Sequence, residues 1–198
     1  SMSFRASPQA QVASQQNPDN LTARVEWTPI RGGVSADGRH GFTFGYMTVT
    51  KADRTKVPMK YLAYWIRQED GWRVVTYRRR PRPEGHVSME LMPPAIPVRM
   101  VPAGLDTAST QRDREGLAAA AERAFSDEAQ KIGLGAAFTK YGRDDAVNLG
   151  GPKAVGFVVG SAAIGRAVGE GTPTNSSPVS WAADHKVIVA SSGVLGVT

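Results

Sequence analysis

Residues 60–75 read KYLAYWIRQEDGWRVV, and this stretch decides the fold. Aromatic and β-branched residues flank the turn tripeptide Glu69-Asp70-Gly71, which predicts two strands joined as a β-hairpin. Successive side chains of a strand point to opposite faces, so the hairpin has one apolar face. An apolar sheet face needs a second layer to cover it, and we therefore look for helices elsewhere in the chain.

A second hairpin precedes this one. Residues 25–30 are extended in character, Ser-Ala-Asp-Gly at 35–38 has hairpin turn chemistry, and residues 41–49 alternate with a period of two. The polar turn at 51–56 then leads into the closing hairpin. The two hairpins together predict a four-stranded antiparallel meander.

Helical periodicity follows a proline-rich stretch at 81–112, which we interpret as a linker. Apolar residues recur at three-to-four spacing over 111–141, with an interruption expected at Gly133 and Gly135, and Gly142 is expected to cap the helix. The remaining predicted elements are a short helix at 8–16, a strand at 146–149, a helix at 161–169, and strands at 179–181, 186–190 and 195–198.

The chain contains an internal repeat. Residues 7–27 align with 161–181 without a gap at an offset of 154 residues, and both stretches end in V-x-W. With one inserted residue, the pattern G-x-x-G-[FV]-T then occurs at 38–43 and again at 193–198. An offset of this size suits a duplicated small unit rather than a solenoid repeat.

These pieces resemble SnoaL-like members of the nuclear-transport-factor-2-like superfamily. The matching motifs are E-R-x-F at 122–125, A-F-x-x-Y-x-x-D-D-A-V at 137–147, S-x-D-G-x-x-G-F-T-x-G at 35–45, and the hairpin at 60–75. The resemblance implies an α+β, cystatin-like cone, in which a strongly curved antiparallel meander sheet is covered by an N-terminal helix pair. Here the unit is expected to be duplicated.

The order of the pieces is unusual for that family. Residues 1–80 match the second half of a first unit, 81–112 form the Pro-rich linker, and 113–198 match the first half of a second unit. Three explanations stay open: the chain is a fragment of a longer tandem protein, segments have been left out, or 7–80 and 115–198 complement each other within one chain or between two. We favour completion of each half unit by a partner segment or by a homodimer.

Composition excludes several functions. No apolar run is long enough to cross a bilayer, so no membrane partner is expected, and the absence of cysteine excludes disulfides and thiolate chemistry. The net charge of +6 comes partly from Arg78, Arg79, Arg80 and Arg82, which we interpret as a solvated strand end rather than a nucleic-acid site. The compartment is periplasmic or extracellular if a signal peptide was removed, and cytoplasmic otherwise.

A cone of this family implies a pocket but no particular reaction. We expect a small apolar ligand, and the residues expected to line its pocket are Tyr46, Tyr64, Trp65, Tyr77 and Phe138. The spacing of His40, His86 and His185 matches no metal-binding motif, so no metal site is expected, and no cofactor is expected.

A general base would need a carboxylate on an inward strand position, whereas Asp37, Asp53, Glu69 and Asp70 all fall in predicted turns. The leading hypothesis is therefore a binding protein that self-associates through its sheet. One alternative is an isomerase- or hydrolase-type enzyme with an aspartate base, for which Asp144, Asp145 and Tyr141 are candidates. Another is a purely structural assembly unit.

Overall fold

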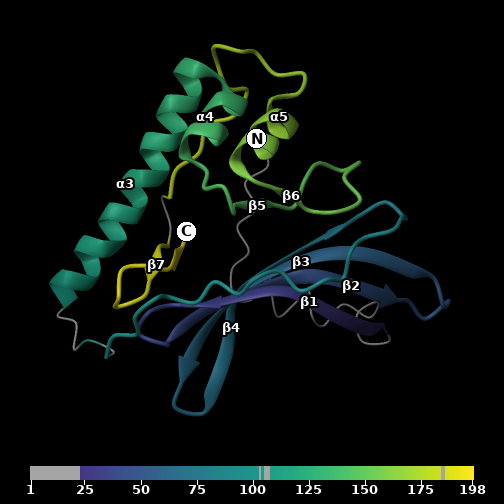
Figure 1. Ribbon diagram of the computed structural model, residues 1–198, viewed down its shortest axis with the longest axis horizontal. Helices are drawn as coiled ribbons and strands as arrows, with labels where there is room; N and C mark the ends of the chain where they lie inside the picture. The colour runs from purple at the N-terminus through teal and green to yellow at the C-terminus, as the bar shows by residue number, and fades with distance from the viewer. Residues whose placement is uncertain (1–22, 103, 105–107, 184–185) are drawn as a thin grey trace.

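The computed structural model describes residues 23–102, 104, 108–183 and 186–198, so the helix predicted at 8–16 lies outside the described residues. The described part is α+β. A four-stranded sheet forms one layer. Helices α3 (Ala108–Ile132), α4 (Leu134–Tyr141) and α5 (Ser161–Gly169) lie over one of its faces (Figure 1).

The sheet is the predicted antiparallel meander, in the order β1-β2-β3-β4. Its strands are β1 (Arg24–Val34), β2 (His40–Thr50), β3 (Lys56–Gln68) and β4 (Gly71–Pro81). The predicted hairpins at 25–49 and 60–75 are thus confirmed. The strands extend further than the sequence pattern indicated, because backbone pairing continues through residues with no clear alternation.

Cross-strand pairs define two faces of the sheet. The face toward the helices carries the pairs Phe42–Tyr64, Phe44–Leu62 and Tyr46–Lys60. The opposite face carries a buried cluster of Met47, Val49, Met59, Tyr61 and Ala63. A strand in this sheet therefore buries apolar side chains on both faces, which explains why β3 reads as a nearly continuous apolar run.

Part of the proline-rich segment lies along the outer edge of β1. The N–H of Met92 donates to the carbonyl oxygen of Ile30 over 2.8 Å, and the N–H of Ala95 donates to that of Gly32 over 2.9 Å. Gly33 and Ala95 form a parallel bridge. The segment thus satisfies backbone groups that an edge strand would otherwise present for pairing with another chain.

The helical half begins with α3 (Ala108–Ile132) and α4 (Leu134–Tyr141), separated at Gly133, whose φ of 86° confirms the predicted interruption. The remaining elements are β5 (Val147–Asn148), β6 (Val158–Val159), α5 (Ser161–Gly169), β7 (Ile188–Val189) and β8 (Gly196–Val197). The bounds of α5 are those predicted.

The prediction of a strand at 179–181 is wrong, because these residues lie outside any strand. The N–H of Trp181 donates to Ser126 Oγ over 2.9 Å, and its ring packs edge-on against Phe125 with centroids 4.8 Å apart. The segment therefore pairs with the side chains of α3, and these contacts replace a strand partner.

Helices α4 and α5 pack closely through glycines. A Cβ atom on Gly135 would lie 2.5 Å from the carbonyl oxygen of Gly165, closer than any real Cβ approaches a backbone atom. The absence of a side chain at both positions lets the two backbones touch.

The helical half covers the sheet of the first half within one chain. Phe157, which precedes β6, packs on Phe44 and Tyr46 with ring centroids 5.1 and 5.2 Å apart. Arg31 of β1, whose side chain is 11% exposed, pairs with the Asp145 carboxylate over 2.9 Å. Figure 1 shows β5 and β6 between the sheet and the helices.

Candidate functional site

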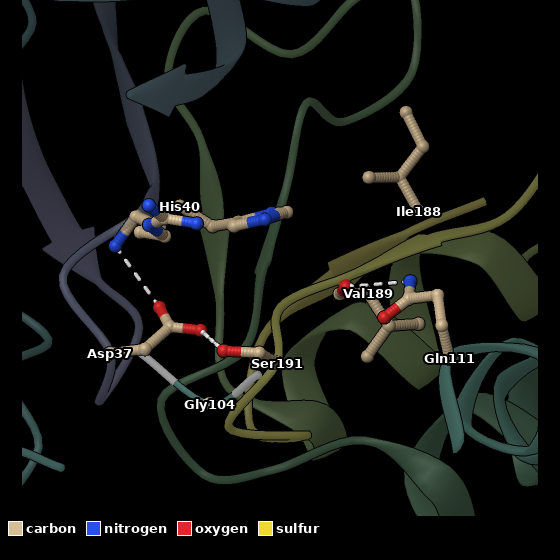
Figure 2. Close-up of a pocket in the computed structure, with 8 residues that line it drawn as sticks. Asp37, His40, Gly104, Gln111, Ile188, Val189 and Ser191 are labelled. Carbon is tan, nitrogen blue, oxygen red and sulfur yellow. Dashed lines mark hydrogen bonds between the residues drawn. The ribbon is translucent and has the colours of Figure 1, made fainter. Parts of the chain in front are cut away.

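An open pocket of about 460 Å³ lies where the β1–β2 turn, the start of α3 and the β7–β8 hairpin meet. We call it the junction pocket. Its lining residues are Asp37, Arg39, His40, Gly104, Gln111, Ile188, Val189 and Ser191. Figure 2 shows Asp37 and His40 on one side, facing Gln111, Ile188 and Val189 on the other.

The Asp37 carboxylate ties the β1–β2 turn to the β7–β8 hairpin. It accepts hydrogen bonds from the hydroxyls of Ser35 and Ser191, the latter over 2.5 Å, and from the backbone N–H groups of Arg39 and Ser192 over 3.0 and 3.1 Å. Burial alone would raise the pKa of Asp37, but these four bonds together hold it well below its usual range. The carboxylate is thus a permanent anion whose hydrogen bonds hold the pocket together.

His40 and Tyr64 form a polar pair beside Asp37. His40 Nδ1 and the Tyr64 hydroxyl share a hydrogen bond of 2.9 Å. Burial lowers the pKa of His40 below its usual value and raises the pKa of Tyr64 to about 12. Both groups are therefore neutral at neutral pH, and His40 is the lining residue best suited to accept a proton from a ligand.

Arg39 is the exposed cation of the junction pocket. It also lines a neighbouring pocket of about 510 Å³ together with Arg67, Gln68 and Glu69. Within residues 23–102, 104, 108–183 and 186–198, no ion pair or hydrogen bond engages the Arg39 guanidinium, which leaves its donors available to a ligand.

The opposite wall consists of Gln111, Ile188 and Val189, and α3 holds it in place. Gln111 Nε2 donates to the carbonyl oxygen of Val189 over 3.1 Å and to Glu115 Oε1 over 2.9 Å. These bonds hold the β7–β8 hairpin against the first turns of α3. Ile188 and Val189 therefore line the side of the pocket opposite Asp37 and His40 (Figure 2).

The two turns that meet at this site have the same backbone hydrogen bonds. In the turn 35–40, the N–H of Ser35 donates to the carbonyl oxygen of His40 over 2.8 Å. The N–H of Gly38 donates to the carbonyl oxygen of Ser35 over 2.9 Å. In the turn 190–195, the N–H of Ala190 donates to the carbonyl oxygen of Leu195, and the N–H of Gly193 donates to that of Ala190, both over 2.8 Å. Both glycines have positive φ, at 67° and 72°.

The aromatic residues predicted to line one pocket lie in three places. Tyr46 and Tyr64 are buried on the face of the sheet toward the helices, whereas Trp65 and Tyr77 pack on the opposite face. Phe138 packs within the helical layer, edge-on to Phe125 with centroids 4.9 Å apart. The sheet separates Trp65 and Tyr77 from the other three residues, and Phe138 packs among the helices, so the five residues do not line a common cavity.

The candidate catalytic residues lie at the junction of the helices and the sheet. Hydrogen bonds from Arg143 and Arg31 hold the pKa of Asp145 down at about 2, which makes it a poor general base at neutral pH. Asp144 is exposed. The Tyr141 hydroxyl donates to the carbonyl oxygen of Ala124 over 3.3 Å, and its ring stacks on Phe125. None of the three lines the junction pocket.

The sequence places Asp37 in a turn, which argues against an inward-facing general base but says nothing about a pocket wall. The turn does form, yet it lies against α3 and the β7–β8 hairpin, so a turn carboxylate becomes part of a pocket wall. The signal available was the S-x-D-G pattern itself, with Arg39 and His40 directly after it.

In the part of the chain that the structure describes, no group of three or more histidine or acidic side chains is placed to hold a metal ion. No described helix is long and apolar enough to span a membrane. Comparisons with protein-family models, with curated proteins and with solved structures gave no match to this chain.

Proposed function

We propose that this chain binds a small molecule in the junction pocket, with the acidic group of the ligand on Arg39 and its apolar body against Ile188 and Val189. The observation that carries the proposal is the Arg39 guanidinium, which has no ion-pair or hydrogen-bond partner among the described residues and lines a pocket of about 460 Å³ together with Ile188 and Val189. Pockets for small molecules combine apolar walls with a few polar anchors in this way. The ligand class is a compact carboxylate with an aromatic or aliphatic body.

The centre of the sheet is less suited to a ligand than its end. Phe44 and Tyr46 are buried against Phe157, and Tyr64 is buried beside His40. Protein side chains already fill this space, so an apolar ligand there would have to displace them. The proposed ligand therefore binds at the edge of the helical layer.

For the fold we propose the duplicated cone of the nuclear-transport-factor-2-like superfamily, with the sheet of a first unit covered by the helices of a second. Two observations support it. The turns 35–40 and 190–195 share both backbone hydrogen bonds, and Phe157 and Asp145 of the helical half contact the sheet of the first half.

Calorimetric titration with benzoate tests the binding proposal. Charge-assisted hydrogen bonds contribute about 1.5–3 kcal/mol, so Arg39→Gln should weaken benzoate binding by about tenfold or more. Ile188→Asp should abolish it, because the new carboxylate repels the ligand and removes an apolar contact. Neutral benzamide should bind the wild type less tightly than benzoate does.

The matched control is Arg54→Gln, which removes an exposed arginine from the β2–β3 turn, away from the pocket. It should bind benzoate like the wild type. Equal affinity of Arg39→Gln and Arg54→Gln for benzoate, or no binding to any of the three proteins, would refute the proposal.

We also propose that two copies associate through an apolar strip that lies along β1. The strip is exposed in the described structure and consists of Met89, Leu91, Ile96, Val98, Met100 and Val101. Exposed apolar groups that cluster in this way mark interaction surfaces. The strip has a carboxylate, Glu90, near one end and a cation, Arg99, near the other, so an antiparallel second copy places opposite charges together.

Light scattering tests this association. Val98 is the most exposed member at 109% of its reference surface, so Val98→Asp should yield monomers while leaving the fold intact. Val194→Asp, an equally radical change at an exposed site on the β7–β8 turn, is the control and should leave the dimer unchanged. A wild-type protein that stays monomeric at all concentrations would contradict the proposal.

A further inference from the structure

Lys60 lies in the middle of β3 on the face toward the helices, and its exposed fraction is 0%. Its ammonium group donates to the carbonyl oxygens of Ala154 and Gly156 over 2.7 and 2.9 Å. Both acceptors belong to the loop 150–157 between β5 and β6. A fully buried lysine normally has a carboxylate partner.

Two arginines lie beside Lys60. Arg80 pairs with it across β3 and β4 and donates to the carbonyl oxygen of Gly150 over 2.8 Å. Arg82 lies over the Tyr46 ring at 5.4 Å and donates to the carbonyl oxygens of Pro83 and Gly85, both over 3.1 Å. The prediction of a solvated strand end is therefore wrong for these two residues, which are half-buried.

Among the residues that the structure describes, no acidic group compensates the charge of this cluster. In the described residues, no carboxylate forms an ion pair with Lys60, Arg80 or Arg82, and their hydrogen-bond acceptors are neutral backbone carbonyls. The Nε atom of Arg82 is buried and has no hydrogen-bond partner. Buried charges without a counter-charge are costly, and groups perturbed in this way cluster at functional sites.

Electrostatics of Lys60 agree with this geometry. Burial lowers the pKa of Lys60 to about 8, and the positive charges of Arg80 and Arg82 contribute to the lowering. The ammonium therefore lies in surroundings that favour loss of its charge. An anion placed among the three groups would reverse this effect.

We propose that Lys60, Arg80 and Arg82 form a binding site for a phosphate group, either free inorganic phosphate or a phosphomonoester. The phosphate oxygens replace the carbonyl oxygens of Gly150, Ala154 and Gly156 as acceptors and give Arg82 Nε its missing partner. Arginine forks and a lysine ammonium match the several acceptor oxygens of phosphate.

Phosphate binding at this site requires the loop 150–157 to move away from Lys60 and Arg80. Its carbonyl contacts to Lys60 and Arg80 are the ones that the phosphate replaces, and a Cβ atom built on Gly151 meets nothing within 4 Å. Gly150 has a positive φ of 73°, a conformation that a glycine leaves and regains easily. The loop then folds back over the bound anion.

Thermal unfolding in phosphate and in chloride, at matched ionic strength and at neutral pH, tests the proposal. Ligand binding to the folded state raises the unfolding temperature, and we expect phosphate to raise it by about 3 °C or more over chloride. Acetate should not reproduce the rise, because a single carboxylate cannot bridge three cations. Arg82→Gln should abolish the rise, and Arg80→Gln, which keeps the buried lysine, should reduce it.

Two control variants locate the effect. Arg78→Gln removes an exposed arginine of the same strand, and Arg39→Gln alters the junction pocket, so both should keep the full response to phosphate. Phenyl phosphate distinguishes the sources: a larger rise than with inorganic phosphate identifies a phosphomonoester, and a smaller one identifies the free ion. An equal unfolding temperature in phosphate and chloride, or an undiminished response in Arg82→Gln, would overturn the proposal.

Discussion

Lys60 makes the stability of this protein depend on pH in the alkaline range. The ordinary pKa of a lysine is 10.5, and in the folded state that of Lys60 is about 8. A folded state that binds the proton less tightly than the unfolded chain gains stability as pH rises from about 8 to about 10.5. A tenfold change in a proton-binding constant corresponds to about 1.4 kcal/mol, so the whole effect is about 3 kcal/mol.

About 2 kcal/mol of this effect falls between about pH 7 and about pH 9.5, by the linkage relation. The upper limit of about pH 9.5 keeps the measurement below the range in which ionisation of the tyrosines affects stability. Burial raises the pKa of Tyr64 and Tyr77 to about 12, so their contribution is fully present below pH 10 and is lost only above it. The unfolding free energy of the wild type should therefore rise by about 2 kcal/mol relative to Lys60→Met across this interval.

Urea unfolding followed by tryptophan fluorescence measures the difference, since the chain contains four tryptophans. The comparison should be made in chloride buffers, so that no phosphate occupies the cluster. Lys56→Met, which changes an exposed lysine at the start of the same strand, should retain the pH dependence of the wild type. Parallel pH profiles for the wild type and Lys60→Met would refute the reasoning.

Two further predictions concern stability at neutral pH, both measured by urea unfolding. Gly135→Ala should destabilise the fold by about 1–3 kcal/mol because its Cβ would clash with the backbone of α5, whereas Gly116→Ala, with open space in α3, should stabilise it by about 0.5–1 kcal/mol. Equal effects of the two would contradict the close packing of α4 and α5. Asp37→Asn should cost about 1–3 kcal/mol through weakened hydrogen bonds, and more than Asp53→Asn, an exposed turn aspartate. The depressed folded pKa of Asp37 means that its stabilisation is present above about pH 4 and is lost as pH falls further, so the difference from the wild type should shrink in acid.

Local sequence patterns were sufficient to predict an element where that segment pairs with its neighbours in the chain. The hairpin around Asp70 and Gly71 joins strands whose partners follow at once, and the helix break at Gly133 needs only a residue that accepts positive φ. The strand predicted at 179–181 failed for the opposite reason. Its backbone partner is Ser126, far away in the sequence, and nothing in a V-x-W pattern identifies a helix side chain as the acceptor.

The junction pocket and the cluster around Lys60 were much less predictable from the sequence than the helices and strands. Alternation along β3 puts Lys60 on the same face as Tyr64, and a lysine in such a row was a usable signal that the sequence reasoning did not take up. No local pattern, however, connects Lys60 to carbonyl oxygens some 94 and 96 positions later. The same holds for Asp37 and Ser191, which are 154 positions apart.

By itself, the sequence determined an α+β protein with a four-stranded meander, a broken helix and a short helix at 161–169, because periodicity and turn chemistry are properties of neighbouring residues. Only the tertiary structure decided that the helices of the second half cover the sheet of the first, and that turn residues become a pocket wall. It also decided that β3 carries a buried cation, Lys60, which has no carboxylate partner among the described residues. These features arise from contacts between distant segments, whose stabilisation depends on shape and burial that no local pattern encodes.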